Sequence, residues 1–227
     1  MDLQKHYNDL YSSSIDLITN QGFKIDKNLD VVNDQRLGVS LIIKVNPTIL
    51  LRIQDFLNKL RSVDPQQYYY EGSQIHITVL SIISCYQGFS LNNIHIEEYI
   101  SLIQNSLIGI KTFNIEYKGI TASDSTIMIQ GFPSGKSLEK LRDSLRINFH
   151  ESSLQQSIDI RYKTVTAHST VARFRKKLNS ASDFITILNR YREHYFGSQE
   201  VGAIDLVLND WYHLSENVEY LHSFQFT

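Results

Sequence analysis

Two short stretches of the sequence follow the same pattern: Ile75-His76-Ile77-Thr78-Val79 and Ala167-His168-Ser169-Thr170-Val171. Both are rich in β-branched and apolar residues, which is typical of β-strands. Alternate residues of a strand project from the same face, so each histidine is expected beside the threonine two positions later. His76 and His168 are 92 residues apart. The pattern therefore predicts two strands that carry equivalent His–Thr pairs.

The segments around the two pairs recur in the same order: strand, helix, strand, helix, strand. Pro47 and Pro133, which stand near the first helix of each half, are 86 residues apart. The third strands, expected to begin at residues 113 and 203, are 90 residues apart. These nearly constant offsets predict an internal duplication. The expected strands are 37–45, 74–83, 113–117, 126–130, 162–174 and 203–208, and the expected helices are 47–60, 94–107, 138–150 and 183–195.

The two halves are expected to form one body, because no stretch rich in proline, glycine and serine separates them. We predict a single bilobal domain over 36–227, with repeat one at about 36–121 and repeat two at about 122–227. Its fold class is α+β: two antiparallel or mixed sheets around a central cleft, with helices outside and a last hairpin arm at 220–226. Residues 1–35 are predicted to form an extra N-terminal helix, packed on the main body by one apolar face, and a connector.

The composition is that of an ordinary globular protein, with 42% hydrophobic and 20% charged residues, which excludes a disordered or collagen-like chain. The 22 basic and 24 acidic residues give a formal net charge of -2. A nucleic acid or other polyanion would therefore have to bind to a local basic patch. Cys85 is the single cysteine, which excludes an intramolecular disulfide. The sequence shows no apolar signal core and no apolar segment approaching about 18 residues. We expect a cytoplasmic, monomeric protein without membrane contact.

Paired imidazoles point to acid–base chemistry, because the unperturbed pKa of histidine lies near neutrality. One ring can accept a proton while the other donates one, an arrangement that suits in-line displacement at phosphorus. Threonine hydroxyls can donate hydrogen bonds to the non-bridging oxygens, where negative charge builds up in the transition state. Two imidazoles on separate strands, without clustered carboxylates, make a poor magnesium site, so we expect no metal.

The paired His-x-Thr motifs in a duplicated α+β frame resemble those of the 2H phosphoesterase superfamily, the family of bacterial 2′-5′ RNA ligase-like proteins and cyclic phosphodiesterases. The resemblance covers roughly the chain from Arg36 onward. It implies that His76 and His168 are catalytic and that Thr78 and Thr170 bind phosphate. It also implies a metal-independent phosphodiesterase, without a cofactor, acting on 2′,3′-cyclic phosphates or 2′-5′ phosphodiester linkages of RNA-derived nucleotides. A nucleotide or an RNA end is then the expected partner.

Further substrate-binding residues are predicted near the pairs. The run 161–177 contains six basic and no acidic residues, and such a patch can attract a nucleotide or an RNA end; a solvated strand end is the plain alternative. Arg173, five residues after His168, fits a frequent pattern of the family, but strict alternation along a strand turns it away from His168. Tyr70 and the two tyrosines before it could stack on a base or simply pack in the core, and the same holds for Trp211.

Two rival functions stay open from the sequence. A protein that binds nucleotides or RNA ends without turnover would carry the same motifs, and acid–base chemistry on a sugar would also use two histidines. The threonines favour a phosphate substrate over a sugar. A turnover assay distinguishes an enzyme from the non-catalytic binding protein. The other histidines are scattered without metal-ligand spacing, and we expect most of them at the surface: His6, His95, His150, His194, His213 and His222.

Overall fold

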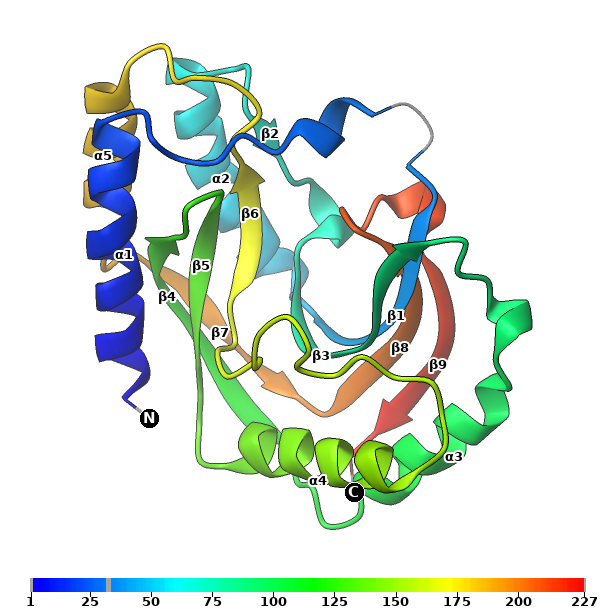
Figure 1. The fold of residues 1–227 in the computed structure, drawn as a ribbon. Helices are drawn as coiled ribbons and strands as arrows, with labels where there is room; N and C mark the ends of the chain where they lie inside the picture. The colour runs from blue at the N-terminus through cyan, green and yellow to red at the C-terminus, as the bar shows by residue number, and fades with distance from the viewer. Residues whose placement is uncertain (1, 32–33, 227) are drawn as a thin grey trace.

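The computed structural model describes residues 2–31 and 34–226 (Figure 1). Residues 1, 32 and 33 of the predicted N-terminal segment, and residue 227 of the predicted bilobal domain, lie outside the described residues. The α-helices within the described ranges are α1 (Leu3–Thr19), α2 (Pro47–Val63), α3 (Ile96–Ser106), α4 (Ser137–Glu151) and α5 (Ala181–Arg190). The strands are β1 (Arg36–Lys44), β2 (Tyr68–Tyr69), β3 (His76–Gln87), β4 (Phe113–Ala122), β5 (Thr126–Pro133), β6 (Ser169–Arg173), β7 (Tyr195–Val201), β8 (Ala203–Asp210) and β9 (Glu219–Gln225).

The strands form two antiparallel sheets, with the orders β3-β1-β8-β9 and β2-β6-β5-β4-β7. In each sheet, the second strand of one predicted repeat pairs with its first strand: β3 with β1, and β6 with β5. The next strand comes from the other repeat, because β8 pairs with β1 and β4 pairs with β5. This exchange ties the two halves into one body (Figure 1). The predicted α+β, two-lobed fold class is thereby confirmed.

The N-terminal helix α1 packs against β4 and α5 in the five-stranded lobe (Figure 1). Its side chains at Tyr7, Tyr11, Ser14 and Ile18 are buried, and this spacing places them on one face of a helix. The carboxylate of Asp2 caps the helix by accepting a hydrogen bond from the backbone N–H of Lys5, at 3.0 Å. The predicted extra helix on the main body is therefore confirmed.

The strand predicted at 162–174 is shorter than expected, because only Ser169–Arg173 joins a ladder. Gly131 of β5 lies so close to the chain before β6 that an added Cβ would stand 1.9 Å from the carbonyl oxygen of Ala167. The chain before β6 thus lies opposite β5 at close approach without joining the ladder. Residues 152–168 form a loop, and Ser157 of this loop donates its backbone N–H to Ile82 at the free edge of β3, at 2.8 Å.

The helix predicted at 183–195 ends at Arg190, and the chain then forms β7, which the sequence pattern did not predict. Apolar and aromatic residues after Arg190 continue the helical spacing in sequence, which hides the change. Gly197 in the middle of β7 also weakens the strand signal. Here the glycine is required by packing, because a Cβ would lie 2.9 Å from the side chain of Ile49 on α2.

Of the helices in the two described ranges, not one combines the length and the apolar composition needed to cross a lipid bilayer.

Candidate active site

The first predicted pair lies on β3, an edge strand of the four-stranded sheet. His76 and Thr78 are partly buried, whereas the intervening Ile77 is fully buried. Pairing with β1 sets this register, with His76 opposite Lys44 and Thr78 opposite Ile42. The alternation predicted from the sequence therefore places the imidazole and the hydroxyl on one face of β3.

The second pair lies where the chain enters β6 in the other sheet: His168 directly precedes the strand and Thr170 is its second residue. His168 and Thr170 are partly buried, whereas Ser169 between them is fully buried. β6 is in contact with β3, and a positive charge on His76 lowers the pKa of His168. The structure therefore brings the two pairs together from equivalent strands of the two sheets.

The two imidazoles have different partners at Nδ1. His76 Nδ1 lies 2.8 Å from the backbone carbonyl oxygen of Gln74. A carbonyl only accepts, so Nδ1 carries the proton and Nε2 remains free for proton transfer. His168 Nδ1 lies 2.7 Å from the hydroxyl of Thr166, which can donate or accept. In both rings the partner is at Nδ1 and not at Nε2, but only the tautomer of His76 is fixed by its partner.

Burial holds both rings neutral. It lowers the pKa of His76 to about 4, against a smaller raising effect from the Gln74 carbonyl. It also lowers the pKa of His168 to about 4, with further lowering by the charges of Arg142, His76 and His6. A bound anion has the opposite effect and favours protonation of either ring.

Arg142 on α4 is a site residue that the sequence analysis missed. Its guanidinium is buried, at 3% exposure, and donates to three backbone carbonyls: Val79 at 2.8 Å, Thr78 at 3.0 Å and Thr166 at 2.8 Å. Burial lowers the pKa of Arg142 to about 10. One side chain thus links the chain segments that carry both pairs. In the sequence it reads as an ordinary helical arginine, so no pattern could have singled it out.

Arg173 lies beyond a register shift in β6, so strict alternation from His168 does not fix its face. The register between β5 and β6 is shifted at Val171, which forms a β-bulge. Past a bulge the alternation of faces moves by one residue, so residues three apart can share a face. Arg173 Nε donates to the hydroxyl of Tyr70 at 2.7 Å, and its guanidinium lies 3.5 Å from the carboxylate of Asp26.

Tyr70 is only 3% exposed, so its ring lies against Arg173 rather than at an open surface. Tyr68 is partly buried and makes an edge contact with Tyr70, at 5.0 Å between ring centroids. Tyr68 also lies 6.1 Å from the ring of Tyr212. These tyrosines and Arg173 form one aromatic cluster next to the chain turn that follows β8.

Much of the basic run 161–177 is already occupied by the connector between α1 and β1. Arg175 pairs with Asp30, Arg173 pairs with Asp26, and Lys177 donates to the carbonyl of Gln21. At the other end of the run, Arg161 lies over the ring of Trp211, at 4.3 Å from its centroid, and Lys163 is exposed. The charge available to a ligand is therefore smaller than the sequence indicates.

His213 is a second residue that the sequence analysis missed: it is buried, although most of the scattered histidines lie at the surface as expected. It is 3% exposed, and its ring centroid lies 4.0 Å from that of His76. Neither ring nitrogen has a hydrogen-bond partner among the described residues. Of the other five scattered histidines, four are exposed and His6 is partly buried.

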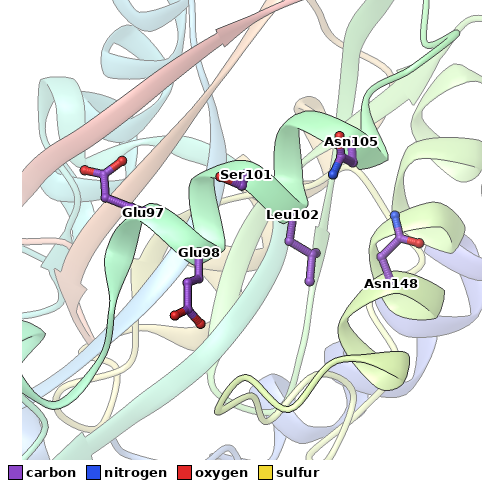
Figure 2. Close-up of a pocket in the computed structure, with 6 residues that line it drawn as sticks. All are labelled: Glu97, Glu98, Ser101, Leu102, Asn105 and Asn148. Atoms are coloured by element: carbon purple, nitrogen blue, oxygen red, sulfur yellow. The ribbon is translucent and has the colours of Figure 1, made fainter.

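Two surface hollows lie away from the pairs. One, of about 540 Å³, runs between α3 and α4, and Figure 2 shows the side chains that line it. The other, of about 510 Å³, lies between α2 and the end of α5. The first hollow is lined by Glu97, Glu98, Ser101, Leu102, Asn105 and Asn148. The second is lined by Arg52, Asp55, Asn58, Lys59, Tyr191, His194 and Tyr195. Neither contains a residue of the pairs or an arrangement for nucleophilic or phosphate chemistry.

No family model matches the sequence, and no curated protein matches it. Solved structures match by fold. The crystal structure of TT0787 of Thermus thermophilus is 14% identical, covers 83% of this chain and 97% of its own, and has a TM-score of 0.60. A structure described as a phosphoesterase is 13% identical, covers 85% and 99%, and has a TM-score of 0.55. E. coli LigT complexed with 3′-AMP is 14% identical, covers 85% and 98%, and has a TM-score of 0.54.

The matches span almost the whole of each solved chain and more than four fifths of the present one. The resemblance to the 2H phosphoesterases that the paired motifs predict therefore holds at the level of the fold: this chain has the fold of E. coli LigT and its structural relatives.

Proposed function

We propose that this protein is a metal-independent phosphodiesterase that acts on 2′,3′-cyclic phosphate or 2′-5′ phosphodiester linkages of RNA-derived nucleotides. The observation that carries the proposal is the convergence of two His–Thr pairs at contacting strands of the two sheets, with His76 close enough to lower the pKa of His168. The fold shared with a phosphoesterase supports phosphoester chemistry. Crystal structures of E. coli LigT with 3′-AMP and with phosphate support a nucleotide substrate.

The two imidazoles divide the proton transfers. The Gln74 carbonyl favours the protonated form of His76, which suits a general acid. The charge of Arg142 disfavours protonation of His168, which suits a general base. In hydrolysis, the oxygen of a water attacks phosphorus and its proton passes to His168 Nε2. The bond from phosphorus to the leaving sugar oxygen breaks, and that oxygen takes a proton from His76 Nε2.

Thr78 and Thr170 supply hydroxyl donors to the non-bridging oxygens, where charge develops. The substrate itself completes the site: its phosphate favours the imidazolium form of His76, which burial otherwise suppresses. The acid is thus charged when the substrate is present. Arg173 is a further candidate to contact the substrate, and its guanidinium is held by Tyr70 and Asp26.

A substrate panel tests the proposal directly. Purified protein is incubated with 2′,3′-cyclic mononucleotides, 2′-5′ linked dinucleotides and RNA ends bearing a cyclic phosphate, with and without EDTA. We expect turnover of at least one of these that survives EDTA. Loss of turnover in EDTA, with restoration by a divalent ion, contradicts the metal-independent mechanism.

One observation favours nucleotide binding without turnover as a second candidate. Both imidazoles have a pKa of about 4, so the site without substrate holds no proton donor at neutral pH. If the substrate phosphate fails to protonate His76, the protein binds its ligand and releases it unchanged. Binding of 3′-AMP together with no turnover across the panel would establish this second candidate.

A further inference from the structure

The turn after β8 is built around one buried carboxylate. Asp210 is 4% exposed, and its Oδ1 accepts the backbone N–H groups of Tyr212 and Leu214, both at 3.0 Å. Its Oδ2 accepts from the side-chain amide of Asn217, at 2.8 Å. These three bonds fix the backbone of the turn, and with it the position of His213.

His213 carries two local energetic costs in this turn, one in its backbone and one in its side chain. Its φ of 57° lies in the left-handed region, which residues other than glycine rarely adopt. Its buried ring has no hydrogen-bond partner at either nitrogen within the described part of the chain. A leucine or a phenylalanine would fill the same space without unpaired polar atoms. Local costs of this kind concentrate at functional sites.

The ring of His213 covers the ring of His76. The two centroids are 4.0 Å apart and the planes are inclined by 38°. The Gln74 carbonyl holds Nδ1 of the same imidazole. His76 is therefore confined at one nitrogen and across one face, and Nε2 is the nitrogen left for proton transfer.

We propose that His213 is a positioning residue for His76, whose neutral ring shields one face of the imidazole from water and holds it in the orientation needed for proton donation. This role rests on the proposed function, because it assumes that His76 transfers a proton. It gives the strained and unpaired ring in this turn a role: the imidazole matches the shape of the ring that it covers.

The charges around His76 agree with a neutral His213. Lys44 stands opposite His76 on β1 and is paired with Asp205, at 3.0 Å. His168 faces it from β6, and Arg142 reaches the carbonyl of Thr78 from α4. The Asp210 carboxylate organises the turn beneath His213. A second imidazolium at 4.0 Å would repel a protonated His76, and burial together with His76 lowers the pKa of His213 to about 2.

The test uses two substitutions and a matched control. His213→Asn removes the ring, and asparagine tolerates the left-handed backbone. His213→Phe retains a ring of similar shape that does not titrate. His222→Asn removes an exposed histidine on β9 and serves as the control. The first readout is an NMR titration of the His76 ring in the absence of substrate, and the second is the pH dependence of kcat and KM.

We expect the pKa of His76 to rise by one unit or more toward 6.5 in His213→Asn, and to stay near its wild-type value in His213→Phe and His222→Asn. We expect kcat to fall on the order of 10-fold in His213→Asn with little change in KM, and to recover in His213→Phe. Unchanged titration of His76 in a folded His213→Asn overturns the proposal. If that variant does not fold, an NMR titration of His213 in the wild type provides the test. The proposal requires the His213 ring to stay neutral from pH 5 to 8, and a His213 ring that titrates near pH 6.5 overturns it.

The NMR readout needs no substrate, so it separates the two claims. Absence of turnover in the wild type on every substrate overturns the proposed function. An unshifted His76 in a folded His213→Asn overturns the role of His213, whatever the wild type hydrolyses.

Discussion

The two His–Thr pairs occupy equivalent strands, yet their surroundings differ. His76 is held by a carbonyl and covered by the ring of His213. His168 is held by the Thr166 hydroxyl and lies near the charge of Arg142. A duplicated backbone thus repeats the placement of the imidazoles, while unrelated side chains give each ring its own electrostatics. The difference allows one histidine to act as acid and the other as base.

The N-terminal helix adds to this difference, because it supports only the second pair. The hydroxyl of Tyr7 donates to the carbonyl of Gly131 at 3.2 Å, next to the point where Gly131 meets Ala167. Thr121 of β4 donates its hydroxyl to the backbone carbonyl of Tyr7, at 2.9 Å. The helix α1 therefore packs behind the segment that leads into His168. Among the described elements, no helix packs in the same way behind the segment that leads into His76.

Replacing either catalytic histidine should have the largest effect. We expect His76→Ala and His168→Ala each to lower kcat by about 10² to 10⁴, the usual contribution of a positioned proton-transfer group. The wild-type kcat should follow a bell in pH. His168→Ala should remove the acidic limb, which reports the base, and His76→Ala the alkaline limb, which reports the acid. The measurement is a pH–rate profile on the substrate found by the panel.

The threonines provide the control for that experiment. Thr78→Ala and Thr170→Ala should lower kcat less than loss of the histidine in the same pair, and both limbs of the bell should remain, because a hydroxyl donor does not titrate in this range. Near-normal turnover in both histidine variants would place the active site elsewhere.

Arg142→Ala should destabilise the protein by roughly 3 kcal/mol or more, because three buried carbonyls lose their donor at once. Arg142→Lys keeps the charge but cannot satisfy all three carbonyls, so its loss should be intermediate. Urea denaturation measures both. The exposed Arg190→Ala on α5 is a matched control. A loss below about 0.5 kcal/mol for Arg142→Ala would show that the guanidinium does not join the two halves.

Acid should weaken the fold through the three clustered histidines. Their folded pKa values lie at about 4 for His76 and His168 and about 2 for His213, below the unfolded value of 6.5. Below pH 6.5 the unfolded chain binds more protons than the folded chain, so the free energy of unfolding falls as pH falls. Above pH 7 these groups contribute no pH dependence.

Thermal melts between pH 7.5 and 5 measure this effect. We expect Tm to fall steadily below pH 6.5, and the slope to become shallower in His213→Asn but not in His222→Asn. A Tm that is constant down to pH 5 would contradict the burial of neutral imidazoles between the sheets.

Tyr7→Phe should have the smallest effect. It removes one buried hydrogen bond, at a cost of about 1 kcal/mol. Since α1 backs only the second pair, the NMR titration of His168 should shift while that of His76 stays unchanged. An equal shift of both rings would show that the helix acts on the whole site, and would remove the asymmetry between the halves.

The frame of the site could be predicted from the sequence because it follows from periodicity. The offsets between Pro47 and Pro133 and between the two motifs indicate the duplication, and alternation around Ile77 and Ser169 places the His–Thr pairs. The exchange of β4 and β8 between the sheets could not be predicted, because a strand's own pattern does not identify its partner strand.

The surroundings of the pairs depend on contacts between distant residues, which leave no mark in local sequence. Arg142 resembles a solvated helical arginine, and His213 resembles a surface histidine. The register shift at Val171, which breaks the alternation between Thr170 and Arg173, depends on the pairing with β5 rather than on a glycine in β6. Each of these features arises from tertiary packing rather than from the local sequence.

The central claim is that both His–Thr pairs serve one phosphate, and a crystal structure grown with inorganic phosphate or 3′-AMP tests it most directly. We predict one phosphate in contact with Nε2 of His76 and His168 and with the hydroxyls of Thr78 and Thr170. A phosphate bound to a single pair, or only to the exposed basic residues of 161–177, would contradict the claim.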